Sequence, residues 1–204
     1  MLILGIDTSL PVFSIAIVND GGIVAAYAAE GRSSRNEKLL PAVEWMLNEG
    51  GIGRSELGLL AVTRGPGSFT GVRVGLATVQ GLAFALGLPV CAISTHESVL
   101  GAEREEALVF SDAGRGEWYV SGFRGGEEEL APSLAGAERL DSLRRSYAET
   151  IDLDALARRE NLALLTARRA GALAARDALA SRADATPIYV RLAEAEQRLR
   201  DGHG

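Results

Sequence analysis

Asp7-Thr8-Ser9 is the first group of side chains in the sequence that could do chemistry. It follows the apolar run 2–6 and precedes a second apolar run at 12–18, so it lies where one strand turns into the next. Two hydroxyls and the neighbouring amides could cradle a phosphate while Asp7 holds a cation through water, as in a vestigial phosphate loop. On three residues alone, the favoured alternative is a turn whose side chains bond the local backbone.

A glycine-rich string runs from Arg64 to Gly75 and reads Arg-Gly-Pro-Gly-Ser-Phe-Thr-Gly-Val-Arg-Val-Gly. It leads into a predicted helix, and the free amides at a helix N-terminus attract anions. The string has neither the Lys-Ser/Thr of a P-loop nor GxGxxG spacing, so by itself it supports nucleotide chemistry weakly. A tight strand-to-helix turn would explain the glycines but not the string Ser68-Phe69-Thr70.

The other residue types that catalysis needs are scarce. His96 precedes a predicted helix and His203 lies in the tail, so paired histidine ligands for a metal cannot be assembled. Serine or thiol catalysis requires a base that this histidine count scarcely supplies. Cys91 lies in an apolar run and is interpreted as a small core residue. We therefore predict no catalytic residue and no metal site.

The apolar pattern predicts the elements that position these residues. Three antiparallel strands open the chain, with a hairpin turn at 19–22. Two amphipathic helices follow at residues 35–49 and 71–86. Pro41 indicates that the first helix starts later or is kinked, and Gly87 caps the second. Strands 59–63 and 88–93 flank the second helix in a βαβ unit.

A second hairpin, at residues 107–112 and 117–123, resembles the opening of the chain and indicates a duplicated lobe. Helical patterns near 139–147 and 167–180 are weaker. We predict an N-terminal lobe over residues 1–100 and a smaller C-terminal lobe over residues 101–204, with a frayed tail.

Composition and charge limit the function. The 204 residues carry 21 Lys and Arg against 27 Asp and Glu, a net charge of −6, which opposes tight binding to nucleic acid by this chain alone. Asp7 comes too early for a signal peptide, and no uncharged apolar stretch approaches the ~20 residues of a membrane span. We expect a cytoplasmic protein with no membrane partner.

Several motifs, in their order and spacing, resemble the TsaB (YeaZ-type) family of tRNA threonylcarbamoyladenosine biosynthesis subunits. The resemblance covers essentially the whole chain and is thin from residue 127 to 186. The motifs are Ile3-Leu-Gly-Ile-Asp-Thr-Ser9, Glu37-Lys-Leu-Leu-Pro41, the string Arg64 to Arg73, Gly81-Leu-Ala83, Ser94-Thr95, Asp112-Ala113 with Glu117 and Tyr119, and Pro187-Ile-Tyr-Val-Arg191.

The resemblance implies an α/β protein of the actin-like ATPase (ASKHA, ribonuclease H-like) fold. Each of its two lobes would hold a mixed sheet flanked by helices, with the second lobe reduced. It also implies a non-catalytic subunit that supports the catalytic subunit TsaD in a heterodimer, with a TsaE-type ATPase in a larger complex. That complex modifies N6 of adenosine 37 in tRNA. The tRNA, and ATP or ADP with Mg, would then be bound at the level of the complex. Catalytic relatives hold a metal with two histidines on the first-lobe helix, and residues 35–38 contain none.

The apolar stripes of the two predicted helices are interpreted as the surface that packs against the partner in a four-helix bundle, or against a second copy in a homodimer when the chain is alone. The predicted interface residues are Leu39, Leu40, Val43, Met46, Val72, Gly75, Leu76, Val79 and Ala83. The alternative is that both stripes simply cover the first-lobe sheet. The rival function is an enzyme, either a stand-alone actin-like ATPase or kinase, or a peptidase.

Overall fold

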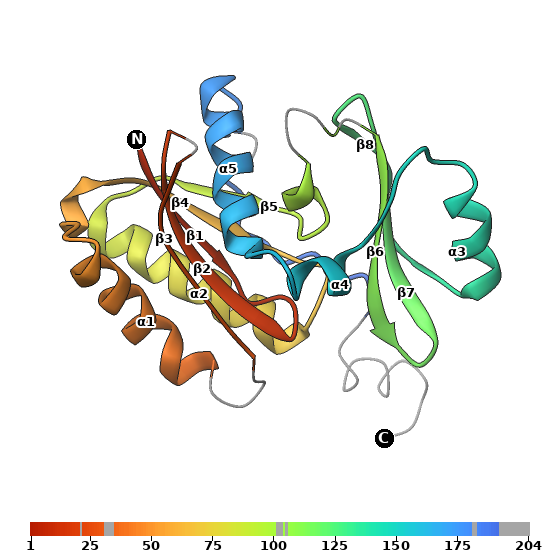
Figure 1. Cartoon of the computed structure of the whole chain (residues 1–204), viewed down its shortest axis with the longest axis horizontal. Helices are drawn as coiled ribbons and strands as arrows, with labels where there is room; N and C mark the ends of the chain where they lie inside the picture. The colour runs from red at the N-terminus through yellow and green to blue at the C-terminus, as the bar shows by residue number, and fades with distance from the viewer. Residues whose placement is uncertain (21, 31–34, 101–103, 105, 181–182, 192–204) are drawn as a thin grey trace.

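The computed structural model contains two β-sheets side by side (Figure 1), and it describes residues 1–20, 22–30, 35–100, 104, 106–180 and 183–191. The first sheet has five strands in the order β3-β2-β1-β4-β5. The second has four strands in the order β8-β7-β6-β9. Each sheet is mixed, because β1 pairs with β4 in parallel and β6 pairs with β9 in parallel, while the hairpins are antiparallel.

The first sheet is built from the opening meander and the βαβ unit. Its strands are β1 (Leu2–Asp7), β2 (Val12–Asn19), β3 (Gly22–Glu30), β4 (Leu57–Thr63) and β5 (Val90–Ile93). The three central strands are nearly continuous apolar runs because helices cover both of their faces. Cys91 is fully buried in this sheet, so its interpretation as a core residue is confirmed.

Two long helices cover one face of the first sheet, and a third covers the other. On one face lie α1 (Arg35–Glu49) and α2 (Phe69–Leu86), and on the other lies α5 (Leu162–Ala175). Pro41 lies inside α1, and the helix continues through it. Gly87 caps α2 in the left-handed conformation, as predicted. Two short 3₁₀ turns, η1 (Arg54–Glu56) and η2 (Glu97–Val99), precede β4 and follow β5.

The second sheet consists of β6 (Ala107–Gly114), β7 (Glu117–Arg124), β8 (Glu127–Ala135) and β9 (Thr150–Asp152). Helix α3 (Ala137–Arg144) packs on one of its faces, and the short α4 (Leu153–Ala157) follows β9. The sheets divide near residue 100, but α5 returns from the second sheet to cover the first. The described part of the C-terminal half therefore contributes to both lobes, because α5 packs in the core of the first sheet.

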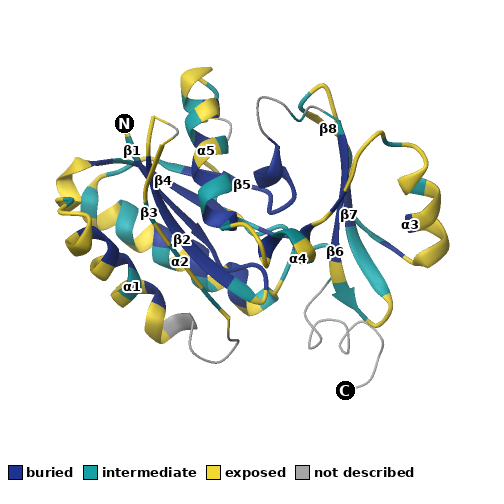
Figure 2. Ribbon diagram, viewed as in Figure 1, coloured by how far each residue is buried: buried dark blue, intermediate teal, exposed yellow. Residues whose placement is uncertain are grey.

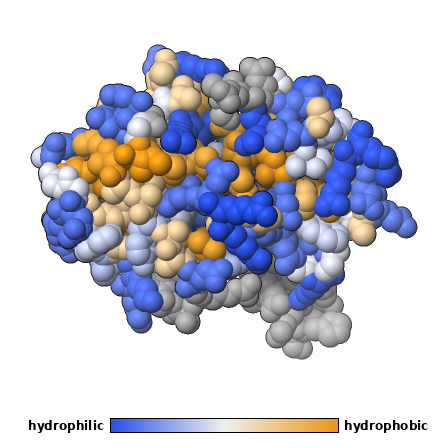
Figure 3. All heavy atoms as spheres, in the orientation of Figure 1, coloured by the Kyte–Doolittle hydropathy of each residue, from blue (hydrophilic) through white to orange (hydrophobic). Residues whose placement is uncertain are grey.

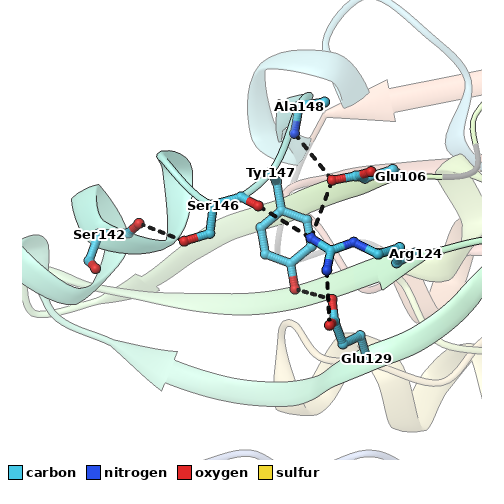
Figure 4. A network of polar contacts seen from close by, with 7 residues as sticks. All are labelled: Glu106, Arg124, Glu129, Ser142, Ser146, Tyr147 and Ala148. Atoms are coloured by element: carbon cyan, nitrogen blue, oxygen red, sulfur yellow. Dashed lines mark hydrogen bonds and ion pairs between the residues drawn. The ribbon is translucent and has the colours of Figure 1, made fainter.

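A polar network ties the segment after α3 to the second sheet (Figure 4). The Arg124 guanidinium lies 3.1 Å from Glu129 and 3.4 Å from Glu106, and it donates to the Ser146 carbonyl. The Tyr147 hydroxyl donates to Glu129 and lies so close to Gly122 that a Cβ there would overlap it. These ion pairs are about half exposed, so each stabilises by at most ~1 kcal/mol.

The helix stripes face inward (Figure 2), which corrects the prediction that they form an exposed surface. Seven of the nine predicted interface residues are buried within the chain, against the first sheet or its loops: Leu39, Val43, Met46, Val72, Gly75, Leu76 and Val79. The physical reason is that each helix must bury one apolar side on its own sheet. Ala83 is half-buried, and only Leu40 faces outward.

Helix α2 is also apolar on its outer side. Only 28% of its 18 residues are buried, and by length and composition alone it is the one described helix that could cross a membrane. A single such helix is weak evidence for a span, and five residues of α2 are buried in this fold. Arg73 lies within α2, so this helix is not the uncharged apolar stretch that the sequence argues against.

We predict that Leu76→Arg destabilises the isolated chain by about 3 kcal/mol or more, because it forces an unpaired charge into the core of the first sheet. The neighbouring Ala77 is exposed, so Ala77→Arg is the matched control and should melt close to the unmodified protein. Thermal melting followed by circular dichroism distinguishes the two. Equal melting temperatures for both variants would contradict the burial of Leu76.

Candidate functional site

A cleft of about 630 Å³ lies between the two lobes. One side is formed by the turn after β1 and by the glycine-rich loop that leads into α2, and the other by the tip of β6 and the start of α4. The lining residues are Ser9, Leu10, Pro11, Gly67, Ser68, Phe69, Thr70, Gly71, Val74, Asp112, Ala113, Gly114, Tyr119 and Asp154.

The Asp7-Thr8-Ser9 turn is bonded to protein groups. Asp7 Oδ1 accepts hydrogen bonds from the Ser9 hydroxyl at 2.6 Å and from the Thr63 hydroxyl at 2.6 Å. The Thr8 hydroxyl donates to the Gly71 carbonyl at 2.6 Å. All three turn residues are buried, and only Ser9 lines the cleft. The geometry is that of the turn alternative, in which the polar side chains hold local structure.

Two glycines of the glycine-rich string allow this turn and α2 to meet. Gly67 has φ +156°, and a Cβ there would overlap the Ser9 carbonyl. A Cβ on Gly75 would overlap the Thr8 hydroxyl. Ser68 N donates to the Ser9 carbonyl at 2.7 Å, and the Ser68 side chain caps α2 by accepting from Gly71 N. The string is therefore explained by close packing between the βαβ unit and the first turn.

The opposite side of the cleft is acidic. Asp154 Oδ2 accepts from the Asp112 amide at 2.6 Å, and burial raises the pKa of Asp154 above its ordinary value. Among the described residues that line the cleft, none is Lys or Arg. Carboxylates such as these repel a phosphate directly and would contact a nucleotide only through a bound cation. Within the described part of the chain, no group of three His, Cys, Asp or Glu residues could hold a metal ion.

His96 lies at the junction of the two lobes, not in the cleft. Its ring nitrogens contact the hydroxyls of Ser121 at 2.8 Å and Ser111 at 3.0 Å, on the two central strands of the second sheet. The next residue, Glu97, forms a buried ion pair of 3.1 Å with Arg169 of α5. Burial lowers the pKa of His96 to about 3, so the ring is neutral and serves as a structural connector.

The outer side of α1 and α2 is a second candidate site, which we call the outer helix face. Its exposed apolar residues are Leu40 and Phe84, which are 50% and 94% exposed. Trp45 of α1 is 54% exposed and lies toward β3, where its ring meets the Tyr27 ring edge-on at 6.4 Å. A groove of about 340 Å³ runs between the two helices. Described residues that line it include Leu40, Pro41, Leu82, Ala85 and Leu86.

Gly81 is the least expected residue of this face. It lies in the interior of α2, is exposed, and has open space where a Cβ would be, so packing within the chain does not require a glycine. Ala77, Gly81 and Ala85 stand four residues apart and form a strip of small exposed residues. Gly81 was named only within the motif Gly81-Leu-Ala83, and Phe84 and Trp45 were passed over because they fall outside the sheet-facing stripe. A mid-helix glycine beside an outward aromatic was the available signal.

We predict that His96 makes the fold acid-sensitive. Its folded pKa is about 3 and its unfolded value 6.5, so the unfolded state binds more protons and stability is lost as the pH falls below 6.5. The loss is about 1.4 kcal/mol per pH unit, or about 2 kcal/mol between pH 6.5 and pH 5. Urea unfolding at several pH values measures this slope, which His96→Asn should reduce.

His203 is present both in the unmodified chain and in His96→Asn, so its ring signal is the internal control for the NMR measurement. Proton NMR should show no titration of the His96 ring between pH 5 and pH 8. A ring that titrates near pH 6.5, or an unchanged slope in His96→Asn, would contradict this assignment.

Comparison with known proteins places the chain in a family. The model of the family "TsaD: tRNA N6-adenosine threonylcarbamoyltransferase" matches residues 13–184. The structure of YeaZ from Pseudomonas aeruginosa has a TM-score of 0.69 at 26% identity and covers 92% of this chain and 99% of that one. A second structure, described as an uncharacterized protein with similarity to the peptidase YeaZ, has a TM-score of 0.72 at 27% identity, over 93% of this chain and 99% of that one.

Relatives with assigned names point to the same family. The tRNA threonylcarbamoyladenosine biosynthesis protein TsaB of Bacillus subtilis is 33% identical over 123 residues, 59% of this chain and 54% of that protein. TsaB of Escherichia coli is 37% identical over 135 residues, 64% of this chain and 58% of that protein. The matched region thus spans little more than half the length of these relatives. The fold is the predicted actin-like one, and the chain belongs to the TsaD family, within its TsaB (YeaZ) group.

Proposed function

We propose that this chain is a non-catalytic subunit of the complex that makes N6-threonylcarbamoyladenosine in tRNA, and that its outer helix face binds a TsaD-type catalytic subunit. We propose this pathway because relatives of the chain are named as tRNA threonylcarbamoyladenosine biosynthesis proteins. The observation that carries the proposal is the exposed apolar surface of α1 and α2, centred on Phe84. In the isolated chain, the same face would pair with a second copy. A TsaE-type ATPase joins at the level of the larger complex.

The outer helix face has the features of a helix-docking surface. Phe84 is almost fully exposed, and leaving such a side chain in water forfeits about 1.5–3 kcal/mol of burial. The strip Ala77, Gly81 and Ala85 would let a partner helix approach α2 closely, since the interaxial distance of packed helices depends on the side chains at the contact. Leu40 on α1 would then border the contact. Aromatic residues in such positions dominate binding energy.

A non-catalytic role is supported by the chemistry of the cleft. Its described lining offers two carboxylates and several hydroxyls, without a basic side chain to balance a phosphate. The Thr8 and Ser9 hydroxyls are committed to Gly71 and Asp7. We therefore assign ATP or ADP with Mg to the complex and not to this chain.

We predict that Phe84→Asp weakens association with the TsaD-type subunit by roughly thirtyfold or more, as expected for loss of a central aromatic anchor. Folding should survive, because the side chain is 94% exposed in the isolated chain. Isothermal titration calorimetry measures the affinity, and circular dichroism melting measures stability. Ile23→Asp is the matched control, since Ile23 is 55% exposed on β3, outside the outer helix face. Figure 3 shows apolar atoms gathered on the left and in the middle of the face that it presents.

We predict opposite effects of Gly81→Leu on stability and on binding. Within the chain there is open space at this position, and leucine is a better helix former, so the isolated chain should gain about 0.5–1 kcal/mol of stability. The added side chain would block close approach of a partner helix and weaken association. Normal association of both Phe84→Asp and Gly81→Leu would refute the outer helix face as the binding surface.

We predict that the isolated chain neither hydrolyses ATP nor binds tRNA tightly. The net charge of −6 opposes the counterion release that drives binding to nucleic acid. ATP hydrolysis is measured by phosphate release in the presence of ATP and Mg. Binding of tRNA is measured by a gel-shift titration at physiological salt. Stoichiometric phosphate release, or submicromolar tRNA binding without the catalytic subunit, would contradict the non-catalytic role.

A further inference from the structure

The segment Thr186 to Arg191, which we call the strap, runs from the first lobe to the second across the cleft-forming loops. It comes after α5 and carries the motif Pro187-Ile-Tyr-Val-Arg191. Neither the sequence motifs of the cleft nor the outer helix face explains it. Its contacts fall into two groups of different strength, one in each lobe.

The first-lobe end of the strap is held by backbone bonds and an aromatic stack. Ile188 N donates to the Arg64 carbonyl at 2.7 Å, and the Arg64 guanidinium donates to the Thr186 carbonyl at 3.3 Å. The Tyr189 ring lies 4.8 Å from the Phe69 ring. Arg73 donates to the Tyr189 hydroxyl at 2.7 Å and also lies over Phe69. This end is therefore attached to the glycine-rich loop and the first turns of α2.

The second-lobe end depends on one side chain. Arg191 donates to the Ala113 carbonyl at 2.9 Å and pairs with the Glu117 carboxylate. Both partners belong to the β6–β7 hairpin, and Ala113 lines the cleft. Glu117 is 42% exposed, so water and salt can compete for this ion pair. Arg191 is the contact of the strap that is easiest to release.

The lobes are joined more firmly at a different place. There, His96 contacts the second sheet, Glu97 pairs with Arg169, and Leu10 from the first lobe is buried in the core of the second. In Figure 1, β5 lies in the middle of the molecule, and the tip of the β6–β7 hairpin lies at the lower right. A buried joint in the middle of the molecule and a partly exposed polar contact near the hairpin tip are the geometry of a hinge and its latch.

We propose that the strap is a latch that sets the opening of the cleft, and that Arg191 is its releasable end. With Arg191 bonded to Ala113 and Glu117, the hairpin is held toward the glycine-rich loop and the cleft is narrow. Loss of these contacts frees the hairpin to move about the joint at His96 and Leu10. Opening of the cleft then increases with salt concentration, because the latch is a partly exposed ion pair.

The test measures the distance between the lobes. Spin labels are attached at Asn48→Cys on α1 and Glu138→Cys on α3, both exposed positions, while the buried Cys91 stays unlabelled. Electron–electron double resonance gives the distance distribution with and without Arg191→Met, which keeps an apolar stem but removes the charge. We expect a broader distribution with a longer mean distance in Arg191→Met. In the unmodified chain, the mean distance between the labels should also increase at high salt.

Two further variants make the result specific. Glu117→Gln should reproduce the effect of Arg191→Met, and the double variant should add little, because both remove the same contact. Arg54→Met is the matched control, since its 2.9 Å pair with Glu44 lies within the first lobe. Hydrogen exchange of the β6–β7 hairpin amides should accelerate only in the latch variants. Distance distributions and exchange rates equal to those of Arg54→Met would overturn the proposal.

Discussion

The close contact between the first turn of the chain and the glycine-rich loop is the constraint on which the rest of the structure depends. Gly67 and Gly75 leave room for Ser9 and Thr8, and the Thr8 hydroxyl and the Ser68 amide bond the two segments together. This contact fixes where α2 begins and which of its sides meets the sheet. Consequently Phe84, Gly81 and the rest of the other side are turned outward. The cleft and the outer helix face both follow from this one junction.

Much of the fold could be predicted because strand and turn signals are local. The Asn-Asp-Gly-Gly turn, the βαβ unit and the Gly87 cap each carry their own physical reason in adjacent residues. The path of α5 could not be predicted in this way. Its Ala-rich pattern has little periodic contrast, and its place on the first sheet is set by distant small residues, among them Gly5, which lets the Ala163 backbone approach β1.

The candidate sites were harder to predict than the fold. Apolar stripes at helical spacing were interpreted as a partner surface, yet Leu76, Val79 and Val72 are buried on the sheet, because each helix must first cover the core of its own domain. A partner surface instead shows itself in residues that the core does not need, such as an exposed Phe84 and a glycine with open space around it. The Asp7-Thr8-Ser9 turn was anticipated, including its alternative role in bonding local structure.

Hydrogen exchange of the chain, alone and in complex with its TsaD-type subunit, is the most direct test of a scaffold that binds through α1 and α2. The account predicts slowed exchange in α1 and α2, with the edge strand β3 unchanged. Protection confined to the β6–β7 hairpin and the cleft, or no protection in either helix, would contradict the account.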